Sequence, residues 1–228
     1  MTPKAIQLLL GAPVLLFAMV AHEYAHGYAA HKQGDDTALM LGRLSWNPLR
    51  HIDPWMTVIL PALMFYTTGM ALGGAKPVPV NPRNYRNYRR GDIIVSLAGI
   101  ATNLLVAVVL LPAIILIGLL ARAVPAFGET ASLLQEMFRL GIYINLLLAV
   151  FNLMPLPPLD GSHVVKHLLP ARAAVAYQQG ARYGFVILIL LLMFGGPVLG
   201  AWMAPAVWLG RLAVDVASPY IIPIPWTT

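Results

Sequence analysis

The sequence predicts an all-α polytopic membrane protein, a bundle of about five or six transmembrane helices with a short re-entrant or β-like segment on the cytoplasmic side. Composition is the first reason. Of the 228 residues, 59% are hydrophobic and 11% are charged, whereas soluble domains carry about 25% charged residues. The second reason is a series of long apolar runs separated by basic or proline-rich stretches. We therefore treat residues 1–228 as a single integral-membrane domain, with a core at 5–163 and C-terminal helices at 171–217.

The first apolar run extends from Ala5 to Ala30 and is predicted to be a retained spanning helix. A signal peptide is the alternative, because Lys4 precedes the apolar residues. No convincing A-x-A cleavage site comes before the polar residues that follow, which favours the helix. A glycine and several charges between His31 and Asp36 predict its end.

Three ionisable residues, His22, Glu23 and His26, interrupt the end of this run. Histidines four residues apart lie on one helix face, and both can reach one metal ion at about 2.0–2.1 Å. Glu23 can act on a metal-bound water as a general base without being a ligand. The alternative is a polar helix end whose histidines extend to the membrane interface. An ionisable trio inside an apolar run is costly and usually functional, which favours the metal.

The next stretch, residues 41–82, is not predicted to cross the membrane simply. Residues 41–54 are polar and proline-rich and predict turns or short strands. The apolar segment Trp55–Met70, with Pro61 inside it, fits either a short span or a re-entrant path. Basic loops flank it on both sides, so the positive-inside tendency favours the re-entrant path. Gly73–Pro82 is predicted to be extended, either as a strand edge for an unfolded peptide or as a simple connector.

The second half of the chain predicts further spans. Ile93–Leu120 is the clearest, with Asn103 as its one strongly polar side chain, and Ala121–Glu136 is expected to be an outer loop. A helix from Met137 to Phe151 must end at the prolines that follow. A backbone broken at membrane depth is tolerated only where it lines protein or a water-filled cavity. Residues 185–216 predict one or two more helices.

The basic residues orient the bundle. Eleven of the fifteen Lys and Arg fall in the three loops assigned to the inside, as expected for cytoplasmic loops. The first helix and the Met137 helix then both run from outside to inside. His22, His26 and Asp160 thus lie toward the cytoplasmic side of the cell (inner) membrane.

The choice of metal and of a third ligand follows from composition. The chain has no cysteine, so any metal must be held by histidine and carboxylate. A catalytic zinc commonly has three protein ligands and one open position. Asp160 is the favoured third ligand, because it follows a broken helix end in the core. The alternative is an ordinary capping or turn aspartate before Gly161.

A zinc ion on these residues would activate water at neutral pH, with Glu23 moving the proton. Asn103 or Asn152 could donate to the developing oxyanion or hold the substrate. For each asparagine the alternative is an interhelical hydrogen bond, which is common in membrane bundles. His51 is a weaker candidate for substrate contact, since a loop histidine is usually solvated.

The paired motifs resemble the site-2 protease family of intramembrane zinc metalloproteases. The resemblance is carried by His22–His26 together with Asn152-x-x-Pro-x-Pro-x-Leu-Asp160-Gly161. Residues 42–45, 51–54, 75–82 and 96–99 resemble its compact prokaryotic branch, which lacks a PDZ domain. The resemblance implies one zinc ion held by His22, His26 and Asp160, with Glu23 as catalytic acid and base. The chain departs from the family where Gly99-Ile100 replaces the usual Gly-Pro.

The expected function is therefore that of an intramembrane zinc endopeptidase acting on transmembrane protein substrates in the lipid bilayer, with no role for nucleic acid. A zinc transporter or sensor is one alternative, but its polar residues should be spread across the bilayer rather than clustered at one depth. A non-catalytic membrane chaperone of the same fold is the other. Glu23 argues against it, because metal binding alone does not require that residue.

Overall fold

The computed structural model describes residues 3–59 and 74–223. Every regular element in these residues is a helix, and five segments are long and apolar enough to cross a membrane: Leu9–Gln33, Tyr88–Ala123, Pro125–Asn152, Ala171–Phe194 and Gly196–Tyr220. The predicted all-α membrane class is confirmed. The re-entrant segment expected at Trp55–Met70 falls mostly outside the described residues, and only its start is seen, in the π-helical turn Pro54–Ile59.

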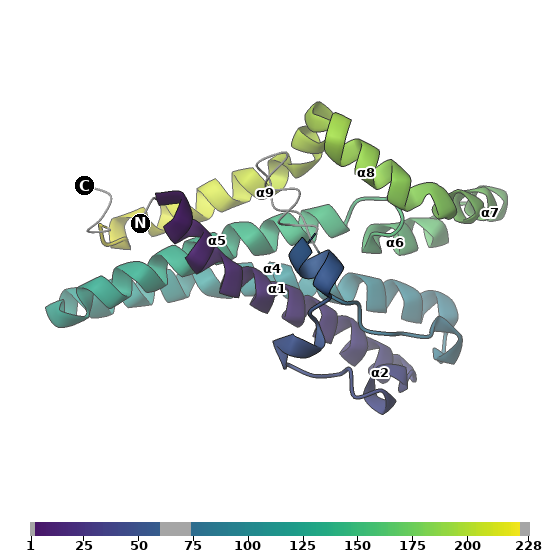
Figure 1. Ribbon diagram of the computed structural model, residues 1–228, viewed down its shortest axis with the longest axis horizontal. Coiled ribbons are helices and arrows are strands. Elements are labelled where there is room, and N and C mark those ends of the chain that lie inside the picture. The colour runs from purple at the N-terminus through teal and green to yellow at the C-terminus, as the bar shows by residue number, and fades with distance from the viewer. Residues whose placement is uncertain (1–2, 60–73, 224–228) are drawn as a thin grey trace.

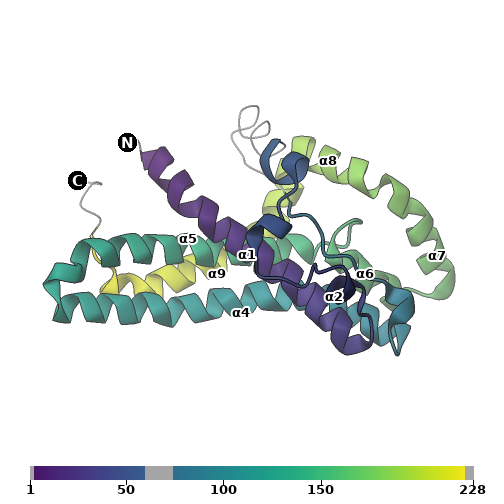
Figure 2. The same ribbon diagram turned by 60° about the horizontal axis from the view of Figure 1, so that its bottom comes forward.

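Within the described residues, four long helices form the bundle: α1 (Pro3–Gln33), α4 (Tyr88–Ala123), α5 (Gly128–Asn152) and α9 (Gly196–Ala217). Helices α4 and α5 lie side by side, α9 packs along α5, and α1 crosses both (Figures 1 and 2). Buried side chains from three of these helices meet in one apolar cluster that includes Ile114, Ile142 and Ala206. This cluster packs α4, α5 and α9 against one another.

The shorter helices gather at one end of the bundle. They are α2 (Thr37–Met40), α6 (Asp160–Leu168), α7 (Ala171–Gly180) and α8 (Gly184–Phe194). Helix α6 lies beside the start of α4, and α7 and α8 arch away from the bundle (Figure 2). The C-terminal part of α1 is at this same end. The histidines of α1 and Asp160 of α6 therefore share one end of the molecule.

Helix α5 differs from its predicted start. The outer loop predicted at Ala121–Glu136 is wrong, because α5 already begins at Gly128 and a 3₁₀ turn at Pro125–Phe127 joins it to α4. The acidic residues that suggested a loop are compatible with a helix. Glu129 is in the first turn, where the helix dipole favours a negative charge, and Glu136 pairs with Arg139 at 2.5 Å.

Residues 74–81 cross the end of α1 without helix or strand pairing. Their backbone is fixed by hydrogen bonds to other parts of the chain. Three backbone N–H groups donate: Lys76 to His51 O at 2.7 Å, Val78 to Glu23 Oε2 at 2.7 Å and Asn81 to Asp35 Oδ2 at 2.6 Å. The Arg43 side chain donates to the carbonyls of Lys76 and Pro77. Prolines supply no N–H. Most groups that β-addition would need are thus used or absent, which favours the connector over the strand edge.

Candidate metal centre

The centre begins on α1, where two histidines face the bundle. The Nε2 atoms of His22 and His26 are 3.0 Å apart, and the ring centroids are 4.6 Å apart. His22 is buried and His26 is partly buried. Their four-residue spacing places one ring above the other on a single helix face. One helix therefore supplies two of the converging nitrogen atoms.

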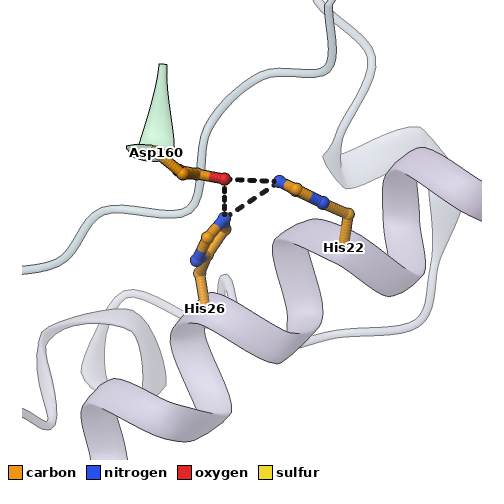
Figure 3. A group of neighbouring side chains, drawn as sticks. All are labelled: His22, His26 and Asp160. Atoms are coloured by element: carbon orange, nitrogen blue, oxygen red, sulfur yellow. Dashed lines mark hydrogen bonds and ion pairs between the residues drawn. The ribbon is translucent and has the colours of Figure 1, made fainter. Parts of the chain in front are cut away.

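The third group comes from the broken region after α5. Turns containing three prolines carry the chain from Asn152 to Asp160, the first residue of α6. Asp160 Oδ2 lies 3.1 Å from His22 Nε2 and 3.3 Å from His26 Nε2. Figure 3 shows the three atoms as the corners of a small triangle. Among the described residues, this is the group of His, Asp and Glu with the geometry to hold a metal ion.

A chain of hydrogen bonds across three helices sets the tautomer of His22. Asn145 Nδ2 donates to the carbonyl of Gly141 at 2.9 Å, so Asn145 Oδ1 is left to accept from Asn103 Nδ2, also at 2.9 Å. Asn103 Oδ1 then faces His22 Nδ1 at 2.6 Å and must accept its proton. Because a neutral imidazole has only one N–H, Nε2 of His22 presents a lone pair to the triangle.

His26 is set in the same way by the backbone of α4. Its Nδ1 lies 2.7 Å from the carbonyl oxygen of Val95, which can only accept. In the neutral ring, Nε2 again presents a lone pair. Two imidazole lone pairs and a carboxylate oxygen thus face one another without a donor hydrogen between them. Such an arrangement needs a cation at its centre, either a proton on one of the rings or a metal ion.

The distances suit zinc. Ligand atoms at about 2.0–2.1 Å from a tetrahedral ion stand about 3.3 Å from each other, and the three edges here are 3.0, 3.1 and 3.3 Å. The donor set of two imidazoles and one carboxylate is one that zinc enzymes use, with a fourth position left for water or substrate. The residues present therefore fit a catalytic zinc ion.

Asp160 is held in its charged form. Burial by itself raises the pKa of the carboxyl group, but the neighbouring rings of His22 and His26 outweigh burial and lower the pKa below its ordinary value. The side chain is 20% exposed. An ionised carboxylate at neutral pH is the form that binds a metal.

Glu23 is next to His22 in the chain but does not join the triangle. Its Oε2 accepts the N–H of Val78 at 2.7 Å from the extended segment. Gly27 lets this segment approach closely, because a Cβ there would lie 2.8 Å from Val78 Cγ1. Glu23 is therefore placed beside the centre with one carboxylate oxygen already committed.

The three weaker candidates are not gathered at the triangle in the same way. Asn103 is fully buried and bonded on both sides of its amide, which suits holding His22 rather than a substrate. Asn152 Nδ2 donates to Leu148 O of its own helix at 3.0 Å. The alternative of a solvated His51 is wrong, because its side chain is fully buried and its ring bonds Ser45 O at 2.8 Å.

Two further residues support the histidines, and the sequence analysis gave neither of them a role at the site. A Cβ on Gly99 would lie 2.6 Å from ring atoms of both His22 and His26, so α4 can approach α1 only with glycine there. Asn145 completes the bond chain to His22. A polar residue in an apolar spanning helix was a signal for Asn145.

Comparison with known proteins agrees with this geometry. The model of peptidase family M50 matches residues 10–195, which include both histidines, Glu23 and Asp160. The chain belongs to peptidase family M50. This is the site-2 protease family, so the resemblance drawn from the motifs is confirmed.

Named relatives are similar to this protein over most of the chain. A Bacillus subtilis protein named "Putative zinc metalloprotease YwhC" is 36% identical, over 78% of this chain and 77% of the relative. The Rip2 proteins of Mycolicibacterium smegmatis and Mycobacterium tuberculosis, with the same descriptive name, are 30% and 31% identical over 85% and 87% of this chain, and 69% and 71% of their own lengths. No solved structure matches the chain. Family and names support a membrane metalloprotease.

Proposed function

We propose that this M50 member is an intramembrane zinc endopeptidase that hydrolyses peptide bonds of transmembrane protein substrates. In this proposal His22, His26 and Asp160 hold one zinc ion, and Glu23 is the general base. The observation that carries it is the triangle itself. Two imidazoles with committed Nδ1 atoms and an ionised carboxylate present three lone pairs at edges of 3.0–3.3 Å.

The chemistry divides between metal and side chains. Bound zinc would lower the pKa of water and polarise the scissile carbonyl. Glu23 lies outside the triangle, so its carboxylate is available to take a proton from the attacking water and return it to the leaving amine. The Val78 N–H holds one oxygen of that carboxylate at 2.7 Å, which leaves the other to carry the proton.

Membrane orientation follows from charge. Helix α1 carries the histidines inside a candidate span. Basic residues gather at the same end of the bundle, among them Lys32 at the end of α1, Arg89 at the start of α4 and Lys166 on α6. By the positive-inside tendency this end faces the cytoplasm. We place the protein in the cell membrane with the active site toward the cytoplasmic side.

The test uses purified full-length protein in liposomes with a model transmembrane substrate. Glu23→Gln should keep wild-type zinc content and lose at least about 100-fold in cleavage rate, the scale of a lost general base. Asp160→Ala should lose zinc and cleavage together. Glu129→Gln, an exposed acid at the far end of α5, is the control and should behave as wild type.

Two results would contradict the proposal. Cleavage by Glu23→Gln at the wild-type rate would remove the general base, and unchanged zinc content in Asp160→Ala would remove the third ligand. Zinc flux into the same liposomes without cleavage would favour the transporter. Zinc binding with neither flux nor cleavage would favour the chaperone.

A further inference from the structure

Helix α6 cannot hold its own position. It has nine residues, Asp160–Leu168, and is flanked by extended residues, Leu159 before it and Leu169 after it. Helices this short are marginal by themselves, because nucleation is costly and few hydrogen bonds repay it. The placement of Asp160 at its first residue therefore depends on contacts between α6 and the rest of the bundle.

The N-terminal end of α6 is fixed by close packing. A Cβ on Gly161 would lie 2.2 Å from the carbonyl oxygen of Leu153 and 2.8 Å from that of Met154. Glycine thus allows the start of α6 to rest directly on the broken end of α5. One contact point still leaves the helix free to pivot about this end.

The C-terminal part of α6 is fixed by one buried carboxylate. Asp92, on the first turns of α4, is only 2% exposed. Its oxygens lie 2.7 Å from Lys166 Nζ, 2.7 Å from His167 Nε2 and 3.3 Å from His163 Nδ1. These three residues share one face of α6. Arg89, also on α4, donates to the carbonyl of His167 at 2.8 Å.

Charge explains why Asp92 is buried there. The start of a helix favours a carboxylate, but a buried carboxylate without partners costs several kcal/mol. Burial lowers the pKa of Lys166, and the hydrogen bond and charge of Asp92 more than reverse this, so its pKa is raised and the ammonium stays charged. The helix dipole alone does not explain the burial of Asp92.

Helix α4 carries the contacts to both histidines of the triangle and to the helix that begins with Asp160. Asn103 bonds His22, the carbonyl of Val95 bonds His26, and Gly99 makes room for both rings. Asp92 is on the same side, since positions 92, 95, 99 and 103 follow the helical repeat of three and four residues. Its partners on α6 follow Asp160 within two turns.

We propose that Asp92 is a positioning residue for the metal centre, holding α6 through Lys166 and His167 so that Asp160 stays in register with His22 and His26. The inference rests on the proposed function for its metal. It assigns to α4 the alignment of the third ligand as well as of the two histidines.

The test measures zinc affinity by competition with a chelator, using full-length protein in detergent. Asp92→Asn should weaken zinc binding about tenfold or more, the range seen when groups that orient ligands are lost, with unchanged helix content. Lys166→Gln should act in the same direction. The zinc affinity of the double variant should be no lower than that of the more weakly binding single variant, because both changes remove the same ion pair between Asp92 and Lys166. Arg172→Gln, an exposed cation on α7, should match wild type.

If Asp92→Asn binds zinc with an affinity within twofold of wild type, the proposed positioning role of Asp92 is wrong, even if the melting temperature of the variant falls. If Asp92→Asn does not fold, the double variant with Lys166→Gln takes its place, because it leaves no buried charge unpaired. A zinc affinity of the double variant within twofold of wild type would then overturn the proposal. Cleavage is measured in parallel. A wild-type protein that binds zinc but cleaves nothing would contradict the protease while leaving the Asp92 result valid.

Discussion

At the residue scale, His22 and His26 each use one ring nitrogen for the scaffold and leave the other for the centre. The scaffold partners, Asn103 Oδ1 and the carbonyl of Val95, both accept hydrogen bonds. Oriented imidazoles of this kind are better metal ligands, because their rotation and tautomer are already set. Asn103 on α4 and Asn145 on α5 are therefore buried where they orient His22.

Gly99 offers a sharp test at this scale. Gly99→Ala would place a methyl group 2.6 Å from ring atoms of both histidines, a distance that real contacts do not show, so the rings or α4 must shift. We expect at least a tenfold loss of zinc affinity by chelator competition. The loss should follow from misplaced rings rather than from a lost ligand.

Gly200→Ala, in α9, is the matched control because no atom lies within 4 Å of the added methyl group. It should bind zinc as tightly as wild type. Equal zinc affinity in Gly99→Ala and Gly200→Ala would mean that α4 and α1 are less closely packed at the centre than the structure shows.

At the element scale, Asp35 fixes the extended segment to the end of α1. It is fully buried and accepts hydrogen bonds from Asn81 N–H, Thr37 and Asn84. Burial by itself raises its pKa, but these hydrogen bonds outweigh burial and lower it. The segment that carries Val78 to Glu23 thus depends on one ionised carboxylate outside the membrane spans.

The pH dependence of stability follows from this lowered pKa. A carboxyl with a lower pKa in the folded state stabilises the fold above its unfolded pKa of about 3.9, and the stabilisation is lost as pH falls toward the folded pKa. Asp35→Asn should therefore melt below wild type at pH 7, and the gap should shrink below about pH 4. Melting curves in detergent measure this. A gap that stays constant across this range would mean that the charge of Asp35 does not stabilise the segment.

At the scale of the whole molecule, one group of contacts that stabilises the fold lies at the end of the bundle opposite the metal centre. Gln135 joins three parts of the chain at the end away from the centre. Its amide donates to Ile114 O and Tyr220 O at 2.9 Å each and accepts from Ile222 N–H at 2.9 Å. It therefore ties the C-terminal residues to α4 and α5.

Gln135→Leu should lower the free energy of unfolding by about 1–3 kcal/mol, since the buried N–H of Ile222 loses its partner. Zinc affinity should remain within twofold of wild type. Thermal melting and chelator competition on the same preparation test both statements. A parallel loss of zinc affinity would show that the two ends of the bundle are coupled.

Several features of the molecule follow from local pattern alone. Apolar runs of spanning length predict the helices, the four-residue spacing of His22 and His26 predicts a shared face, and prolines after Asn152 predict the break that leads to Asp160. The start of α5 was not predicted, because acidic residues such as Glu136 suggested a loop. In the structure Glu136 pairs with Arg139 within the helix, so its charge is compatible with a helix. That pairing is not visible in a count of charges.

The sequence by itself determined the membrane class, the helical segments and the set of residues able to bind zinc, because each depends on composition or on spacing within one element. Only the tertiary structure decided which Nε2 lone pairs face Asp160, why Gly99 must be glycine and what holds α6. Those features join residues about 70 to 140 positions apart, as in Lys166 with Asp92 and His22 with Asp160. Contacts between distant residues arise from helix packing, and no local periodicity encodes them.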